Sequence, residues 1–377
     1  MGKCGHVLFG VGAVLCASIV TVASAAAPSS HDVAPKISHK SEMVFSANQG
    51  EHNLSVYKVD EASGGLIEVP GSPYATGKFP VSVSVTPNGK FVYVANQGSE
   101  SLSVFHVSGK SGKLTKVKGS PFAVGHYPDA VEVSPDGQFL YVANEDDNLI
   151  TAYRISASGA ISRVGKSQPT GAHPIAITLA PNGKMAFVSN FHNASVSSYL
   201  INVKTGELTP SSSPAKTEDR PIYVSVTPDN QFAYVANYGS TTVSAFHIDP
   251  ITAALTPVPG SPFKAGAQPY SVTVDPSEHF LYAANWGSRD VSAFTLDSKT
   301  GVLTKVPGSP FATEWFPYAV VVDPIGHFAY VANNGAGNIG AYKIDPATGA
   351  LAQLPGSPYK SGLGPYSLSV VSVSDAE

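Results

Sequence analysis

Apolar and polar residues alternate along most of the chain in short runs that are separated by tight turns. Val81–Val85 alternates strictly, and the turn sequence Pro87–Gly89 follows it. Phe91–Ala95 is then a continuous apolar run, ended by Asn96 and a glycine-containing turn. Neither run has the period of a helix, so this pattern predicts short antiparallel strands joined by tight turns.

The same pattern recurs at a nearly fixed interval. The tetrapeptide Tyr-Val-Ala-Asn, or a close variant, ends at Asn48, Asn96, Asn144, Asn190, Asn237, Asn285 and Asn333. A proline opens an alternating run at Pro80, Pro128, Pro174, Pro221, Pro269, Pro317 and Pro365. Each unit holds four strand signals. A four-stranded meander repeated every ~40–50 residues is the signature of a β-propeller blade.

The two landmarks are offset, and the offset predicts how the ring closes. The first Tyr-Val-Ala-Asn-type strand, 43–48, has no proline-led strand before it, and the last proline-led strand, 365–370, has no successor. Pairing these two strands hides edges that would otherwise promote aggregation. We therefore expect an all-β, seven-bladed β-propeller with four antiparallel strands per blade, closed by the C-terminal strand in the first blade.

The N-terminal segment has the features of a secretion signal. Lys3 is its only charge, Val7–Val22 is nearly all apolar, and Ala23–Ala25 offers a small-x-small cleavage site. We expect residues 1–25 to be a signal peptide, 26–40 a flexible linker and 41–377 the propeller. The mature protein would then be secreted or periplasmic, with no membrane attachment. Cys4 and Cys16, the only cysteines, would be removed with the signal.

Charge excludes one class of partner. The chain has 23 Lys and Arg against 27 Asp and Glu, and no cluster of basic residues stands out. Nucleic-acid binding needs such a cluster, so no nucleic-acid partner is expected. We expect a monomer that binds either a small molecule (a sugar or an aromatic acid) or a peptide.

The repeat also resembles a known family. The segment Pro80–Asn96 and the ending Gly362–Val370 are similar to the Tyr-Val-Thr-Asn propeller repeats and to the seven-bladed lactonase family. That family includes bacterial 6-phosphogluconolactonase and the fungal carboxymuconate-cyclising enzyme. The resemblance covers residues 41–377 and implies the propeller fold and lactone chemistry.

The catalytic positions of that family carry other residues in this chain. The resemblance implies a His opening the third inner strand, an Arg opening the fourth, a Glu after the next strand and a further Arg on a later blade. By repeat register these positions are Ile175, Ile222, Tyr238 and either Tyr270 or Tyr318. Arg220 lies two residues before the expected arginine. The sequence therefore predicts no efficient 6-phosphogluconolactonase activity.

Variation between the units is concentrated in two sets of loops, those entering the inner strand and those leaving the second strand. In a propeller these loops share one rim, and loops on a rigid scaffold are where function diverges. An aromatic, concave face suits sugars, aromatic acids or peptides; the alternative is that the aromatic rings only plug the channel. The ligand-binding candidates are Asp129, Tyr238, Tyr270, Trp286, Trp315, Tyr318 and Tyr366.

Ionisable residues of the same rim supply the candidates for chemistry. His173, Arg220 and Glu145 are the catalytic candidates. Asp129, Glu132 and Glu145 are the oxygen donors that could hold Ca²⁺, although a solvated acidic rim is the interpretation we favour, and no metal or cofactor is expected. Glu132 differs from its equivalents, which are Ser84, Thr178, Ser225, Thr273, Val321 and Ser369.

Two functions remain open on this basis. The first is an exported lactonase-like propeller that serves as a ligand-binding or interaction module through its aromatic rim. The alternative is a hydrolase of lactones or related cyclic esters with a rearranged site. An enzyme needs a base and an electrophile stabiliser that converge on one point, whereas a binding module does not.

Overall fold

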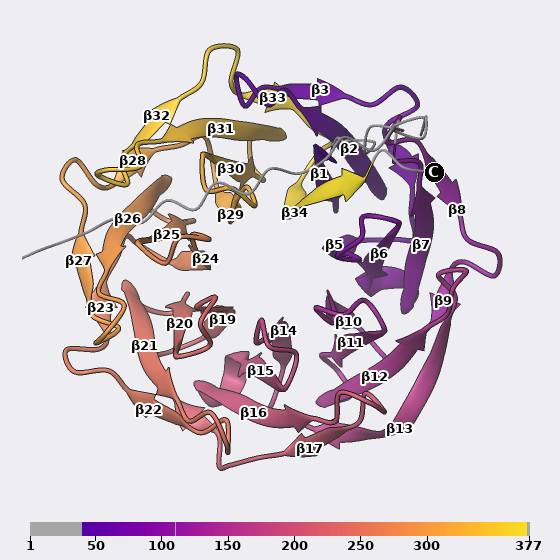
Figure 1. Cartoon of the computed structure of the whole chain (residues 1–377), viewed down its shortest axis with the longest axis horizontal. Coiled ribbons are helices and arrows are strands. Elements are labelled where there is room, and N and C mark those ends of the chain that lie inside the picture. The colour runs from indigo at the N-terminus through magenta and orange to yellow at the C-terminus, as the bar shows by residue number, and fades with distance from the viewer. Residues whose placement is uncertain (1–39, 110, 375–377) are drawn as a thin grey trace, which may run out of the picture. The chain divides into compact units, whose positions relative to one another are not determined.

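A computed structural model describes residues 40–109 and 111–374. They form seven antiparallel sheets arranged in chain order around a central channel (Figure 1). The predicted all-β, seven-bladed propeller is confirmed. The predicted signal peptide, 1–25, and the linker up to residue 39 lie outside the described residues. Within the described part of the chain, no helix has the length and apolar character needed to cross a membrane.

In each blade the innermost strand begins at the predicted proline, and the second strand ends at the predicted asparagine. The innermost strands are β5 (Pro80–Val85), β10 (Pro128–Val133), β14 (Pro174–Leu179), β19 (Pro221–Val226), β24 (Pro269–Val274), β29 (Pro317–Val322) and β34 (Pro365–Ser374). The second strands are β1 (Lys40–Asn48), β6 (Phe91–Asn96), β11 (Phe139–Asn144), β15 (Met185–Asn190), β20 (Phe232–Asn237), β25 (Phe280–Asn285) and β30 (Phe328–Asn333). The second strands lie between two neighbours in the sheet and are almost wholly buried, which explains their continuous apolar sequence.

The two outer strands complete each blade. The third strands are β2 (Asn53–Val59), β7 (Ser101–Val107), β12 (Leu149–Ile155), β16 (Ser195–Ile201), β21 (Thr242–Ile248), β26 (Asp290–Leu296) and β31 (Asn338–Ile344). The fourth strands are β3 (Leu66–Glu68), β8 (Leu114–Lys116), β13 (Ile161–Pro169), β17 (Leu208–Pro210), β22 (Leu255–Pro257), β27 (Leu303–Lys305) and β32 (Leu351–Gln353). Two 3₁₀ turns, η1 (Gln97–Ser99) and η2 (Phe191–Asn193), follow second strands.

The outer edge of most blades is broken into two pieces, which the sequence did not predict. In six blades a two-residue strand pairs with the other half of the third strand: β4 (Tyr74–Ala75), β9 (Phe122–Ala123), β18 (Ala215–Lys216), β23 (Phe263–Lys264), β28 (Phe311–Ala312) and β33 (Tyr359–Lys360). In five blades the sequence Gly-Ser-Pro lies between the two pieces, and its serine bridges the break. The amide of Val104, for example, donates to Ser120 Oγ at 2.8 Å. The serine hydroxyl thus replaces a missing ladder partner.

The C-terminal strand closes the ring in the predicted blade. β34 pairs antiparallel with β1 from Lys40↔Ser374 to Asn48↔Pro365 (Figure 1). Leu368 and Val373 on β34 are buried in the cores that the first blade shares with its two neighbours. The strand runs to Ser374, four residues beyond the predicted end at 370.

Tyrosine hydroxyls join one blade to the next. Tyr93 Oη donates to the carbonyl of Gly159, in a turn of the following blade, at 2.9 Å. Tyr330 makes the same bond to Gly64 across the closure, also at 2.9 Å. Because both groups are buried, each bond satisfies two polar groups that would otherwise lack a partner. The tyrosine of Tyr-Val-Ala-Asn is therefore an inter-blade contact.

The repeated asparagine has a structural role. The Asn96 amide donates to Ser103 Oγ on the third strand at 3.0 Å, and its carbonyl oxygen accepts from the amide of Gly77 at 3.0 Å. The buried side chain thus ties the second strand to the third and to the loop that enters the blade.

Candidate functional site

The two predicted loop sets are joined by the same hydrogen bond in every blade. The amide of the residue after the repeated Asn donates to the carbonyl of the residue before the inner-strand proline, in each case at 2.9 Å. The pairs are Gln49–Gly364, Gln97–Phe79, Glu145–Tyr127, Phe191–His173, Tyr238–Arg220, Trp286–Gln268 and Asn334–Phe316. These seven pairs form one rim around the channel, which we call the rim below.

The residue before each inner-strand proline adopts a left-handed backbone. φ lies between 51° and 56° at Phe79, Tyr127, His173, Arg220, Gln268 and Phe316, and is 67° at Gly364. A non-glycine residue pays about 1–2 kcal/mol for this conformation. Backbone outliers of this kind cluster at functional sites. The side chains that differ most between blades are therefore displayed at strained positions.

A cavity of about 80 Å³ opens at the centre of the ring. Asp129, Tyr270, Tyr318 and Tyr366 line it, and all four occupy the position directly after the inner-strand proline. In the other three blades this position holds Val81, Ile175 and Ile222. At this level of the cavity one side is therefore aromatic, and the other is aliphatic apart from the Asp129 carboxyl group.

Five of the predicted aromatic candidates lie in one connected group. Tyr270 is the centre: its ring centroid lies 4.2 Å from that of Tyr318 and 5.8 Å from that of Tyr238. Tyr238 in turn contacts Trp286 at 6.0 Å. The hydroxyls of Tyr270 and Tyr366 are 2.5 Å apart. Burial is the main cause that raises the pKa of both phenols well above the usual range, so both remain protonated hydrogen-bond donors.

Trp315 lies apart from this aromatic group. Its side chain is 55% exposed, and the Arg289 guanidinium lies 4.3 Å from its ring centroid. Phe316, 6.2 Å away, links it to Trp286, on which Phe316 stacks at 4.6 Å. Trp315 therefore forms an outer contact with Arg289 and does not line the cavity with the tyrosines.

Asp129 is a buried acid beside the tyrosine pair. Only 7% of it is exposed, and Gln97 Nε2 donates to its Oδ1 at 2.6 Å. Burial and then the neighbouring Glu145 carboxyl raise the pKa of Asp129 well above its usual range, and the Gln97 bond opposes them only partly. Asp129 is consequently protonated more readily than an exposed aspartic acid, and in that form it can donate a hydrogen bond.

Glu145 connects this acid to a histidine. Glu145 Oε1 lies 2.5 Å from His173 Nδ1. A carboxylate only accepts, so in this contact Nδ1 carries the proton. The His192 ring packs edge-on against His173, with centroids 4.1 Å apart. Glu145 thus fixes the tautomer and orientation of His173, as a general base requires.

Arg220 does not converge with this pair. Its Nε lies 3.8 Å from Asp219 Oδ2, and its guanidinium lies 5.8 Å from the Phe191 ring. Among the described residues it has no hydrogen bond or ion pair with either Glu145 or His173. Of the three catalytic candidates, the structure therefore brings together two, and places the third outside, against an aspartate.

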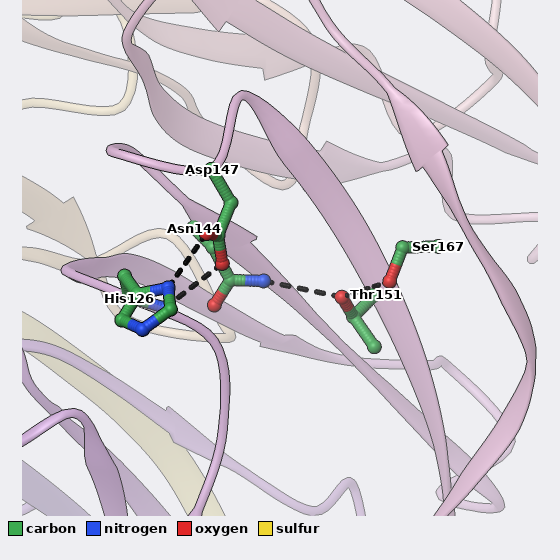
Figure 2. A network of polar contacts seen from close by, with 5 residues as sticks. All are labelled: His126, Asn144, Asp147, Thr151 and Ser167. Atoms are coloured by element: carbon green, nitrogen blue, oxygen red, sulfur yellow. Dashed lines mark hydrogen bonds and ion pairs between the residues drawn. The ribbon is translucent and has the colours of Figure 1, made fainter.

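A second histidine–carboxylate pair lies within one blade, whereas the first joins two blades. His126 Nδ1 is 2.7 Å from Asp147 Oδ1, and Asp147 Oδ2 also accepts from the His126 amide at 2.9 Å. The hydrogen bond from His126 to Asp147 raises the pKa of His126. Figure 2 shows this pair beside Asn144, whose amide points away from it to Thr151. The pair joins the loop before β10 to the turn after β11. It lies at the surface, since the His126 side chain is 67% exposed.

Glu132 lines the cavity but is separate from Asp129 and Glu145. Its charge affects Tyr223, a cavity residue that sequence reasoning missed. The signal for Tyr223 was present: the equivalent positions hold only the small residues Ser82, Ala130, Ala176, Ser271, Ala319 and Ser367. Tyr223 is 41% exposed, and it borders the cavity. Among the described residues, no three His, Cys, Asp or Glu side chains are grouped closely enough to hold a metal.

This arrangement combines opposite chemical roles within one site. The Glu145–His173 pair lies on the rim, and Asp129, Tyr270 and Tyr366 line the cavity. A histidine oriented by a carboxylate is the usual form of a general base, and hydroxyl or protonated carboxyl groups are the usual neutral donors.

Comparison with protein families gives a consistent result over nearly the whole chain. The profile described as "Lactonase, 7-bladed beta-propeller" matches residues 16–127, 120–220, 192–258 and 251–362. No curated protein sequence matches the chain.

Solved structures share the fold at low sequence identity. A candidate 6-phosphogluconolactonase from Bacteroides uniformis has a TM-score of 0.78 at 18% identity, and the match covers 88% of this chain and 99% of that one. A second candidate 6-phosphogluconolactonase, from Bacteroides fragilis, scores 0.77 at 20% identity, with 90% and 100% covered. The periplasmic gluconolactonase of Pseudomonas aeruginosa scores 0.73 at 19% identity, with 89% and 99% covered.

Proposed function

This chain belongs to the lactonase family of seven-bladed β-propellers, and we propose that it hydrolyses uncharged lactones at the mouth of its channel. The observation that carries the proposal is the Glu145–His173 pair, whose carboxylate is near enough to raise the pKa of the buried Asp129 and of Tyr366. This is the combination of a base and neutral donors that a binding module does not need.

The base in this proposal is His173. Its Nε2 takes a proton from a water molecule as the water oxygen attacks the lactone carbonyl carbon. The imidazolium that forms is stabilised by Glu145, which holds Nδ1–H at 2.5 Å. When the ring C–O bond breaks, Nε2–H returns the proton to the leaving alkoxide. The product is the open-chain hydroxy acid, and His173 is neutral again.

The carbonyl oxygen becomes negatively charged in the tetrahedral intermediate and needs hydrogen-bond donors. Tyr270, Tyr366 and protonated Asp129 are the neutral donors that line the cavity. Such donors work best in a partly desolvated site, where their orientation is fixed before the reaction. The short hydroxyl pair and the Gln97–Asp129 bond supply that fixed orientation.

The charge of the site favours an uncharged substrate. The Glu145 carboxylate lies near the mouth, and the charge of Arg220 is partly balanced by Asp219, 3.8 Å away. A phosphorylated lactone would bring its negative charge toward the carboxylate of Glu145 without a free arginine to receive it. Export is part of the same proposal. It is supported by the signal-like N-terminus and by the periplasmic gluconolactonase of Pseudomonas aeruginosa among the similar structures.

Replacing His173 tests the proposed base. We expect His173→Gln to lower kcat for glucono-δ-lactone by about 10²-fold, with a smaller change in KM, because the amide cannot take a proton from water. His126→Gln is the matched control, since it removes a histidine from the other histidine–carboxylate pair of the rim. Its kcat should stay within about twofold of the unmodified enzyme.

Two results would contradict the proposal. One is equal loss of activity in the two variants, which would show that only the fold was disturbed. The other is ligand binding, followed by tryptophan fluorescence, in a protein that hydrolyses no lactone at all. The second result would favour the ligand-binding module.

A further inference from the structure

Aromatic side chains form a continuous row from the cavity to the exposed surface of the rim, and we propose that this row binds a second sugar unit carried by the lactone. The substrates would then be glycosylated sugar lactones, with the lactone at the mouth and the second sugar on the row. This inference rests on the proposed function and adds the chemical class of the substrate to it.

Six side chains, each in contact with the next, make up the aromatic row. From the cavity outward they are Tyr366, Tyr270, Tyr238, Trp286, Phe316 and Trp315. Successive ring centroids lie between 4.6 and 6.2 Å apart. Tyr366 and Tyr270 line the cavity, so the row connects the proposed reaction site with the surface of the protein.

The outer end of the row is its most exposed part. Tyr238, Trp286 and Phe316 are partly buried, whereas Trp315 is 55% exposed. An exposed indole ring gains free energy when apolar surface covers it. The face of a sugar ring that carries C–H groups supplies such surface, and the hydroxyl groups of the same sugar remain in contact with water.

Arg289 adds hydrogen-bond donors at this end of the row. Its guanidinium lies 4.3 Å from the ring centroid of Trp315 and 5.6 Å from that of Phe316. Among the described residues, this guanidinium has no hydrogen-bond or ion-pair partner. An arginine that stacks on an aromatic ring keeps its N–H donors available, and sugar hydroxyls accept such bonds. An apolar aryl group would cover the donors without replacing their bonds to water, so we favour a sugar.

The outer end of the row is specific to one blade. The residues equivalent to Trp315 by repeat register are Lys78, His126, Ala172, Asp219, Ala267 and Leu363. None of them is a tryptophan, tyrosine or phenylalanine. The protein has only two tryptophans, and both lie in the row, so tryptophan emission reports directly on ligands that bind there.

A comparison of two lactones measures the contribution of the row. Cellobiono-δ-lactone is glucono-δ-lactone with a second glucose unit on its fourth oxygen. We expect its kcat/KM to be about tenfold higher, because the added unit stacks on the row. The gain should appear mainly as a lower KM, since this contact is the same in the ground state and in the transition state.

Cellobiose gives a second readout that does not require turnover. It contains the same second sugar but no lactone to hydrolyse. We expect cellobiose to change the tryptophan emission of the protein, and glucose to require about ten times the concentration for the same change.

Trp315→Ala removes the outer ring, and Phe79→Ala is the matched control. Phe79 is also an aromatic residue of the rim and is 46% exposed, but among the described residues its ring contacts His52 and no ring of the row. We expect the preference for cellobiono-δ-lactone to fall to about twofold or less in Trp315→Ala and to remain in Phe79→Ala. Trp315→Leu replaces Trp315→Ala if circular dichroism shows that the latter is unfolded.

The outcomes separate the two proposals. Equal kcat/KM for the two lactones, with both hydrolysed, overturns the glycosyl inference and leaves the proposed function standing. Cellobiose binding that depends on Trp315, in a protein that hydrolyses neither lactone, overturns the proposed function and leaves the sugar site standing. A preference for cellobiono-δ-lactone that survives in a folded Trp315→Ala or Trp315→Leu protein also overturns the inference. So does an equal gain when a phenyl group is added to γ-butyrolactone, because the row would then select apolar rings.

Discussion

A chain truncated after Gly364 should fail to fold into a cooperative domain. The deletion removes β34, which pairs with β1 along its whole length and buries Leu368 and Val373 between blades. Each of these side chains contributes about 1.5–3 kcal/mol by burial alone, and the lost ladder and neighbouring contacts add to this. The sum approaches the 5–15 kcal/mol that stabilises a typical domain.

The truncated chain should also aggregate, because β1 would become an exposed edge strand. Urea unfolding followed by circular dichroism, together with light scattering, measures both effects. Removal of residues 375–377 alone is the control and should leave the unfolding midpoint unchanged. A truncated protein with the midpoint and m value of the full chain would contradict the closure described above.

Replacing Glu132 by Gln should stabilise the protein at alkaline pH. Burial raises the pKa of Glu132 from 4.5 to about 8, so ionisation is less favourable in the folded state than in the unfolded state. Folding therefore loses stability as pH rises from about 4.5 to about 8, and the loss is complete above that range. The glutamine is neutral at every pH and avoids this cost.

The expected size of the effect follows from the shift. One pKa unit corresponds to about 1.4 kcal/mol. Because part of the Glu132 surface is accessible from the channel, we expect a gain of about 3 kcal/mol at pH 9 and almost none at pH 4.5. Urea titrations at the two pH values measure it. Glu218→Gln, an exposed position, should change neither. An equal gain for Glu132→Gln at both pH values would refute the ionisation argument.

The fold could be predicted from the sequence because its signals repeat. Seven prolines and seven Tyr-Val-Ala-Asn-type strands gave seven blades, and the unpaired segments at 43–48 and 365–370 indicated the closure. The broken outer strand was missed because each piece is short. The serine that bridges the break, such as Ser120, acts through its side chain, which no strand pattern records.

The site could be predicted only in part. Register alone placed Tyr238, Tyr270 and Trp286 on one rim, where they do contact each other. Trp315 was grouped with them, but its ring lies against Arg289. Its neighbour Phe316 has a left-handed backbone although it is not a glycine. The sequence therefore gave no signal of this conformation, and the direction of these side chains could not be predicted.

The sequence also could not predict which charged residues pair with each other. Glu145 had several possible partners among the basic residues of the rim. The structure pairs it with His173 and leaves Arg220 to Asp219. The choice depends on rotamers and loop geometry, because the candidates lie at similar positions in neighbouring blades.

The central claim is that an acid-lined channel mouth hydrolyses uncharged lactones. The most direct test compares kcat/KM for glucono-δ-lactone and for the same lactone carrying a phosphate at its sixth carbon, with purified mature protein. A negative charge held about 6 Å from a carboxylate costs about 2.8 kcal/mol at an effective dielectric constant of ~20. We therefore expect the phosphorylated lactone to be at least about a hundredfold poorer. Preference for the phosphorylated lactone, lost on Arg220→Ala, would contradict the account and would assign to Arg220 the role of binding the phosphate.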